Sequence, residues 1–120
     1  AIAGVGNCAS SLMQGLAYYK NADKGAAGLM HEDVAGYTLD SIEVVAAFDV
    51  DARKVGKSVE EAIFAEPNNT TVFCKEIPAT GVPVQMGHVH DGIAEHMSYW
   101  DEKYAFRQAD ATPVDVAQVL

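Results

Sequence analysis

The chain alternates short, strongly apolar runs with stretches whose apolar residues recur at helical spacing. Residues 42–50 (IEVVAAFDV) form a nearly continuous apolar run, which is typical of a strand covered on both faces of a parallel sheet. Shorter runs at 1–3 and 82–86 predict two further strands. Helical spacing predicts helices over 7–21, 51–64, 93–104 and 114–120. This β-α-β-α-β-α order predicts an α/β fold with a parallel sheet and right-handed crossovers.

The first predicted helix has the clearest apolar stripe. Leu12, Met13, Leu16 and Ala17 are spaced so that they face one side of a helix. Asn7 precedes the stripe and is predicted to be the N-cap, because its side-chain oxygen can accept a hydrogen bond from a free amide of the first turn. Asp51 is expected to cap the second helix in the same way.

A glycine-rich turn joins the first strand to the first helix. The letters GVGNCA match the pattern G-x-G-x-x-[G/A] in the strand–turn–helix context of dinucleotide-binding sites. Gly4 permits the tight turn, Gly6 lets the backbone approach a pyrophosphate, and Ala9 lets the helix pack close to the strand. The free amides of Asn7, Cys8 and Ala9 would face the anion, which the helix dipole also favours. The motif indicates a Rossmann-like sheet that binds a dinucleotide, with a tight turn that binds no ligand as the alternative.

An acidic residue ends the second predicted strand. Asp49 lies at the carboxyl edge of the sheet, where it can accept hydrogen bonds from the adenosine ribose hydroxyls. It follows Gly6 by 43 positions rather than by about 20, and the extra length falls in the loop over 24–41. A carboxylate there repels a 2′-phosphate, which favours NAD over NADP. Arg53 could instead reach a 2′-phosphate, and it is the main reason to consider NADP.

Charge and cysteine content disfavour several classes of function. The chain has 8 Lys and Arg against 17 Asp and Glu, a net charge of −9, so its surface repels nucleic acids and anionic membranes. Cys8 and Cys74 lie outside any CxxC pair, which predicts two reduced thiols in a cytoplasmic protein rather than a zinc ribbon or a disulfide scaffold. Cys8 is expected to be buried as a small packing residue.

Six short segments, spread over nearly the whole chain, are more specific than the glycine turn alone. They are GVGNCASSL at 4–12, GLMH at 28–31, VAAFDVD at 45–51, EAIFA at 61–65, PNNT at 67–70 and PVDV at 113–116. Together they closely resemble the myo-inositol-1-phosphate synthase (inositol-3-phosphate synthase) family of the actinobacterial and archaeal type.

The resemblance implies an isomerase of inositol and phospholipid biosynthesis. Members convert D-glucose 6-phosphate to 1D-myo-inositol 3-phosphate by oxidation with NAD, internal aldol cyclisation and reduction, and they form homotetramers. The family's catalytic lysines and sugar-phosphate site lie in later sequence, in a second, α+β domain. We therefore expect residues 1–120 to be an NAD(P)-binding Rossmann-type domain, truncated at both ends, without catalytic or metal-binding residues and inactive alone. The residues expected to contact NAD are Gly4, Gly6, Asn7, Cys8, Ala9, Ser10 and Asp49.

A histidine pair follows the third predicted strand. His88, His90 and Asp91 could meet as metal ligands, but a solvent-facing loop is the favoured interpretation. In that loop, Gly87 and Asp91 would border the adenine side of the cofactor cleft.

Other residues and functions stay open at this point. His31 is a further candidate for a place near the cofactor, and Trp100, with Tyr99 and Tyr104, is expected in the core and in an interface. The alternatives to a synthase are an ordinary NAD-dependent dehydrogenase with the same half-fold and a non-enzymatic nucleotide-binding module. The dehydrogenase would show net turnover of NADH, whereas the synthase would not.

Overall fold

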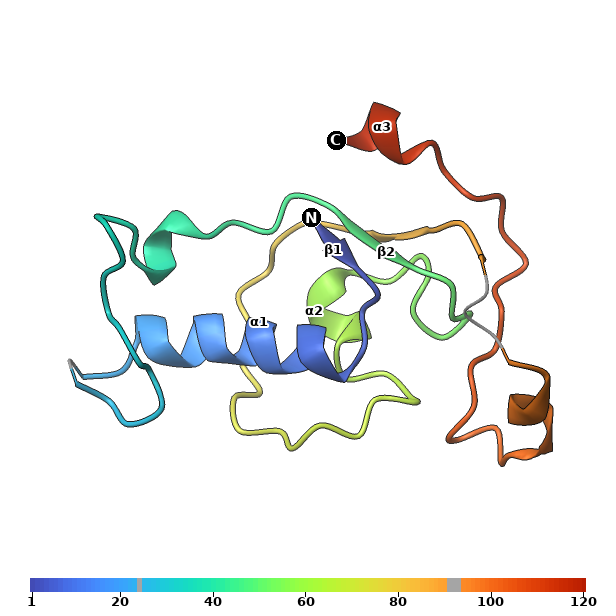
Figure 1. Cartoon of the computed structure of the whole chain (residues 1–120), viewed down its shortest axis with the longest axis horizontal. Helices are drawn as coiled ribbons and strands as arrows, with labels where there is room; N and C mark the ends of the chain where they lie inside the picture. Colours follow the sequence, from blue (N-terminus) through green and yellow to red (C-terminus); the bar gives the residue numbers. More distant parts are fainter. Residues whose placement is uncertain (24, 91–93) are drawn as a thin grey trace.

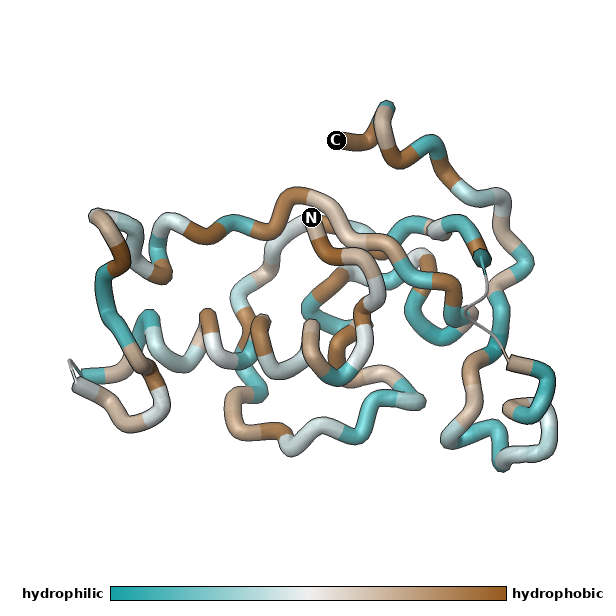
Figure 2. Tube along the Cα trace, in the orientation of Figure 1, coloured by the Kyte–Doolittle hydropathy of each residue, from teal (hydrophilic) through white to brown (hydrophobic). Residues whose placement is uncertain are grey.

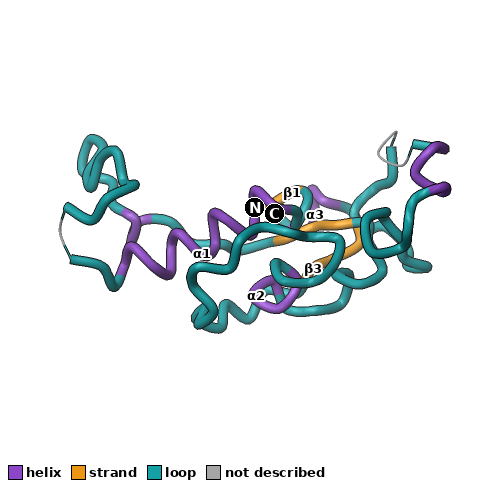
Figure 3. The backbone as a smooth tube through the Cα atoms, turned by 90° about the horizontal axis from the view of Figure 1, so that it is seen from below, coloured by secondary structure: helices purple, strands orange, loops and turns teal. Residues whose placement is uncertain are grey.

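Three parallel strands lie at the centre of the molecule in the computed structural model, which describes residues 1–23, 25–90 and 94–120 (Figures 1 and 3). The strands are β1 (Ile2–Ala3), β2 (Ala47–Asp49) and β3 (Val84–Met86), in the order β1-β2-β3. Ala47 pairs with Ile2 on one side and with Val84 on the other, so the most apolar run is the central strand. The predicted α/β fold with an open, Rossmann-like parallel sheet is confirmed.

The paired part of β2 is shorter than the predicted strand. Pairing with β1 begins where the amide of Ile2 donates to the carbonyl of Ala46 at 2.9 Å. Residues 42–45 precede this point and are not assigned to a strand, and Val45 is 63% exposed. An apolar run indicates where a strand can form, but its length depends on how far its neighbours extend.

Helices lie on both sides of the sheet. α1 (Asn7–Lys20) and α2 (Val59–Ala62) lie on one side, and α3 (Val116–Val119) lies on the other (Figure 1). The short α3 has no buried residue and leaves its side largely uncovered. Apolar residues gather along β1, β2 and α2 (Figure 2). Each fully buried large apolar side chain stabilises the fold by about 1.5–3 kcal/mol. The core cluster consists of Val5, Met13, Ala47, Val59, Ala62, Ile63 and Val84.

The buried face of α1 differs in part from the predicted stripe. Met13, Leu16 and Ala17 are buried as expected, whereas Leu12 is 47% exposed. Ala9, Met13 and Ala17 are buried and follow one another at intervals of four residues, so they lie on one face of the helix. Leu12 lies beside this face rather than on it.

The predicted helix over 51–64 is wrong as a single element. Residues 52–56 form turns, and within 51–64 only Val59–Ala62 are α-helical. Gly56 has a φ of +87°, a left-handed conformation that an α-helix cannot include. Val59, Ala62 and Ile63 after it are still fully buried, so their spacing correctly predicted burial but not an unbroken helix.

The C-terminal third is also less helical than predicted. In place of a helix over 93–104, of which residue 93 lies outside the described residues, there is the short 3₁₀ segment η2 (Glu95–Tyr99). Trp100 is 63% exposed and Tyr99 and Tyr104 are exposed too, so their expected place in the core is wrong. A second 3₁₀ segment, η1 (Leu39–Ser41), lies in the long loop after α1.

Candidate cofactor-binding site

The glycine turn leads from β1 directly into α1. Gly4 has a φ of +87°, and its amide donates to the carbonyl of Phe48 at 2.8 Å, which ties the turn to β2. A residue with a side chain would be strained at this φ by about 1 kcal/mol or more. The backbone therefore accounts for the glycine at position 4, as the motif predicts.

Gly6 is different, because nothing in the fold requires a glycine there. Its φ of −90° and ψ of −160° are open to any residue, and an added Cβ would meet no atom within 4 Å. The space in front of its backbone is therefore free for a ligand. This is the arrangement that a pyrophosphate needs in order to approach a main chain closely.

The first backbone amides of α1 lie next to the free space in front of Gly6. The first turn of a helix has amides without intrahelical acceptors, and no described residue accepts a hydrogen bond from the amides of Asn7, Cys8 or Ala9. α1 has 14 residues, and its dipole favours an anion at this end. The open approach at Gly6 and these amides together fit a dinucleotide pyrophosphate.

Asp49 lies beside this turn at the carboxyl edge of the sheet and is only 7% exposed. Its Oδ2 accepts from the amide of Val5 at 2.7 Å, and its Oδ1 accepts from the amides of Val50 and Asp51 at 2.7 and 2.8 Å. A carboxylate has about four acceptor positions, so a further position on Oδ2 is available for a ribose hydroxyl. The carboxylate thus has a structural role in holding the glycine turn that the sequence did not suggest.

A hollow of about 420 Å³ opens at this edge of the sheet. It brings together residues from separate segments of the chain, three of which contain residues named from the sequence, whereas Phe106 was not predicted. Those that bear on cofactor binding are Gly4, Asp49, Gly87, His88, His90 and Phe106. The expected place of Gly87 at the rim agrees with this geometry, whereas Asp91 lies outside the described residues.

A buried lysine, Lys54, donates a hydrogen bond to the backbone of the glycine turn. Lys54 has no exposed surface, and its Nζ donates to the carbonyl of Val5 at 2.8 Å and to Oδ1 of Asn68 at 2.7 Å. Asn68 in turn donates from Nδ2 to the carbonyls of Val5 and Ile63 at 3.0 Å. Burial lowers the pKa of Lys54, although the nearby carboxylates of Asp49 and Asp51 favour its charged form. Sequence reasoning missed this residue, because a lysine in an amphipathic pattern is normally exposed.

Asn7 does not cap α1, which corrects the prediction. Gly6 is the N-cap residue and makes no side-chain bond, and Asn7 is the first helical residue. Its Oδ1 instead accepts from the amides of Asn69 and Thr70 at 2.8 and 3.1 Å and from Oγ1 of Thr70 at 2.8 Å. The side chain of Asn7 therefore holds the 68–70 loop beside the glycine turn, and its amide is the part left for a ligand.

Of the next three residues, the first is exposed and the other two are buried. Cys8 is exposed, so its predicted burial is wrong: it occupies the outer side of the first helical turn. Ala9 is buried, as close packing of the helix on the strand requires. Ser10 is also buried, and its Oγ accepts from Nε2 of Gln14 at 3.1 Å.

Asp51 and Arg53 form an ion pair just after β2, with 2.6 Å between Oδ2 and Nη2. The prediction that Asp51 caps the second helix is wrong, because the N-cap residue of α2 is Ser58. Asp51 instead accepts from the amide of Arg53 at 2.8 Å in the turn that follows β2. Burial raises the pKa of Asp51, but hydrogen bonds from Arg53 and from the amide of Arg107 together outweigh this and bring the pKa below 3.8.

The remaining candidates are histidines, of which His88 and His90 line the hollow at the carboxyl edge. His88 and His90 are exposed, as predicted, with ring centroids 6.1 Å apart. Residues 1–23, 25–90 and 94–120 contain no group of three side chains placed to hold a metal. His31 lines a different hollow in the 31–42 loop. Within the described residues, no helix has the length and apolarity to cross a bilayer.

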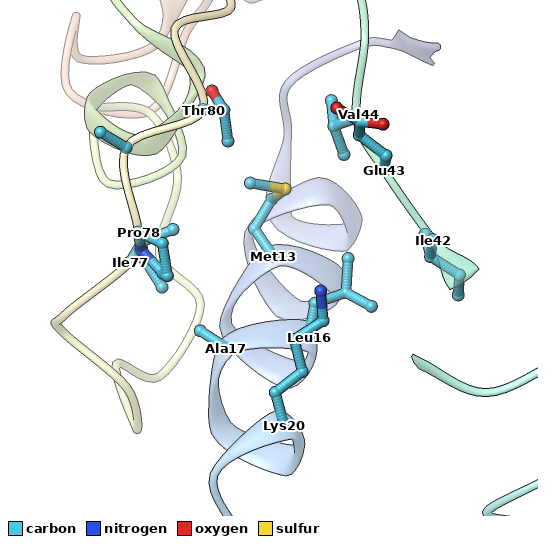
Figure 4. Close-up of a pocket in the computed structure, with 11 residues that line it drawn as sticks. Met13, Leu16, Ala17, Lys20, Ile42, Glu43, Val44, Ile77, Pro78 and Thr80 are labelled. Atoms are coloured by element: carbon cyan, nitrogen blue, oxygen red, sulfur yellow. The ribbon is translucent and has the colours of Figure 1, made fainter. Parts of the chain in front are cut away.

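A second hollow, of about 250 Å³, lies between α1 and the segments 42–44 and 77–80 (Figure 4). Met13, Leu16 and Lys20 line it from α1, and Val44 and Ile77 line it from the other segments. It contains none of the residues that the sequence predicted for the cofactor, so the hollow at the carboxyl edge is the better candidate.

Comparisons with known proteins agree with the resemblance found in the sequence. Over 122 aligned positions that cover all of this chain, it is 50% identical to the inositol-3-phosphate synthase of Mycolicibacterium smegmatis. The identity is 48% for the synthase of Mycobacterium tuberculosis and 45% for that of Corynebacterium glutamicum. The match covers 32% of each relative, so the chain spans about a third of their length.

A solved structure shares the fold. The crystal structure of Ari2 matches 74% of this chain and 28% of its own chain, with a TM-score of 0.68 and 35% identity. No family model matches the chain. The resemblance to inositol-3-phosphate synthases is confirmed by the relatives of 45–50% identity.

Proposed function

Because this chain is homologous along its full length to part of the inositol-3-phosphate synthases, we propose that it is the NAD-binding portion of such an enzyme. The observation that carries the proposal is the identity of 45–50% over the whole chain. The open backbone at Gly6 supports it independently, since it offers room for a phosphate at the end of α1. We expect the catalytic residues of the family to lie in a second domain, outside residues 1–120.

Different residues contact different parts of the cofactor. The amides of Asn7, Cys8 and Ala9 bind the pyrophosphate, with Gly4 and Gly6 giving the backbone its shape and its close approach. Asp49 accepts from a ribose hydroxyl. Ser10 is assigned by resemblance alone, and its buried hydroxyl supports the helix from within.

NAD is favoured over NADP on two grounds. The Asp49 carboxylate at the edge of the hollow repels a 2′-phosphate. Arg53, the residue that could bind a 2′-phosphate, is already bound to the fully buried carboxylate of Asp51.

The complete enzyme converts D-glucose 6-phosphate to 1D-myo-inositol 3-phosphate in the cytoplasm, as a homotetramer. NAD supplies the hydride acceptor for the oxidation and the donor for the final reduction, so none is consumed. Residues 1–120 bind and orient this cofactor at the edge of the sheet. No residue among them is assigned to the chemical steps.

A chimeric enzyme tests this proposal. The matching stretch of the Mycolicibacterium smegmatis synthase is replaced by this chain, and the product is assayed by phosphate release after periodate oxidation. We expect inositol phosphate to form from glucose 6-phosphate without accumulation of NADH. Net NADH production would indicate an ordinary dehydrogenase, and a folded chimera that binds NAD without conversion would indicate a binding module; either result contradicts the proposal.

A further inference from the structure

We propose that Asp51 and Arg53 are positioning residues that set the cofactor preference of the hollow, an inference that rests on the NAD-binding function proposed above. The pair holds residues 102–109 against the carboxyl edge of the sheet, where Phe106 forms part of the wall of the hollow. The hydrogen bonds to Asp51 also keep the Arg53 guanidinium from binding a 2′-phosphate.

The pair is closely bonded. Asp51 has no exposed surface. Its Oδ1 accepts from Nε of Arg53 at 2.9 Å and its Oδ2 from Nη2 at 2.6 Å, a two-point contact that fixes the plane of the guanidinium. Oδ2 also accepts from the amide of Arg107 at 3.1 Å, so the same carboxylate contacts the C-terminal segment directly.

Arg53 reaches the C-terminal segment as well. Its Nη1 donates to the carbonyl of Glu102 at 2.7 Å, and its Nη2 donates to the carbonyl of Ala105 at 2.6 Å. Arg107 is held from the other side, because its carbonyl accepts from the amide of Ala52 at 2.6 Å. The residues on both sides of Phe106 are therefore fixed to the loop that follows β2.

Phe106 is the part of this segment that a cofactor would meet. It is 39% exposed and lines the hollow together with Asp49, Gly87 and His90. An aromatic ring at this position offers a face on which the adenine can stack. Correct placement of Phe106 thus depends on a pair of residues that does not line the hollow.

The same bonds determine what Arg53 can bind. An arginine near the end of the second strand is the usual partner of a 2′-phosphate, and Arg53 lies four residues after Asp49. The edge of the guanidinium that would pair with a phosphate is already paired with Asp51. Loss of the Asp51 charge would free it, so Asp51 excludes NADP without touching the cofactor.

Calorimetric titration of three variants with NAD, NADP and ADP-ribose tests this proposal. Phe106→Ala should lower the affinities for NAD and for ADP-ribose equally, by about tenfold, because base stacking on an aromatic side chain is lost. Asp51→Asn should lower the affinity for NAD, and it should raise the affinity for NADP relative to that for NAD by about tenfold. Arg53→Met should weaken NAD without this relative gain, since no cation is freed.

Arg107→Met is the matched control. Among the described residues, the Arg107 side chain bonds Glu102 alone, in an exposed pair. Methionine keeps the backbone bonds of residue 107, so all three affinities should be unchanged. The proposal is overturned if Asp51→Asn shows no relative gain for NADP, or if Phe106→Ala weakens NAD but not ADP-ribose. Should thermal unfolding show that Asp51→Asn does not fold, unchanged NAD affinity in Arg53→Met or Phe106→Ala overturns it. A Gly6→Val variant that binds NAD normally would instead contradict the proposed function itself.

Discussion

The Gly6→Val variant is expected to lose NAD binding while it keeps the fold. The added side chain meets no protein atom within 4 Å, so it enters the space where a pyrophosphate would approach the backbone. Loss of two charge-assisted hydrogen bonds at about 1.5 kcal/mol each corresponds to a loss of affinity of about a hundredfold. Calorimetric titration with NAD measures the affinity. Thermal unfolding checks that the N-cap change costs no more than about 1 kcal/mol.

Gly15→Ala is the control for Gly6→Val. Gly15 lies on the same helix, and a Cβ there also meets no atom within 4 Å. The change should stabilise the helix by about 0.8–1 kcal/mol and leave NAD binding unaltered. If Gly6→Val and Gly15→Ala bind NAD equally well, the glycine turn is only a tight connection between strand and helix.

Replacing Lys54 with methionine is expected to lower the free energy of unfolding by about 2–4 kcal/mol. The ammonium is fully buried and donates to Val5 and Asn68, so its removal takes a donor from both acceptors and leaves the Asp49 carboxylate without its nearby cation. Such a loss is a large fraction of the stability of about 5–15 kcal/mol that domains of this size have. Urea unfolding followed by circular dichroism measures the change.

Lys57→Met is the matched control, because Lys57 is exposed three residues further along the same loop. It should change stability by less than about 0.5 kcal/mol. The lowered pKa of Lys54 adds a second readout. The unfolded chain binds this proton more tightly, so stability rises with pH from the folded pKa to the ordinary value of 10.5, and Lys54→Met should reduce the rise. Equal stability losses in the two variants would contradict the supporting role of Lys54.

The parts of the site that the sequence predicted follow from local chemistry. Residues 42–50 are apolar on both faces, and such a run predicts a central strand whatever lies beside it. A glycine turn between a strand and a helix, and an acid at the end of the next strand, meet at one edge because parallel strands end there together. The structure accordingly places Gly4, Gly6 and Asp49 at one edge of the sheet.

The features that the sequence did not predict depend on hydrogen-bonding residues far away in the chain. Lys54 is buried because acceptors at Val5 and Asn68, 49 and 14 residues away, receive its hydrogen bonds. The Asn7 side chain turns from its own helix toward Thr70, 63 residues away. The broken helix at Gly56 has a local signal, a glycine, but the helical spacing on either side of it concealed the break.

Titration of the ¹⁵N-labelled chain with NAD observes the proposed contact one amide at a time. We expect the amide resonances of Asn7, Cys8 and Ala9 to shift together and to saturate, because these amides bind the pyrophosphate. The amide resonances of Gly25 and Gly36, in the loop beyond the far end of α1, should not shift. Resonances of the glycine turn that do not move at saturating NAD, or that move no more than those of Gly25 and Gly36, would show that this edge of the sheet is not a cofactor site.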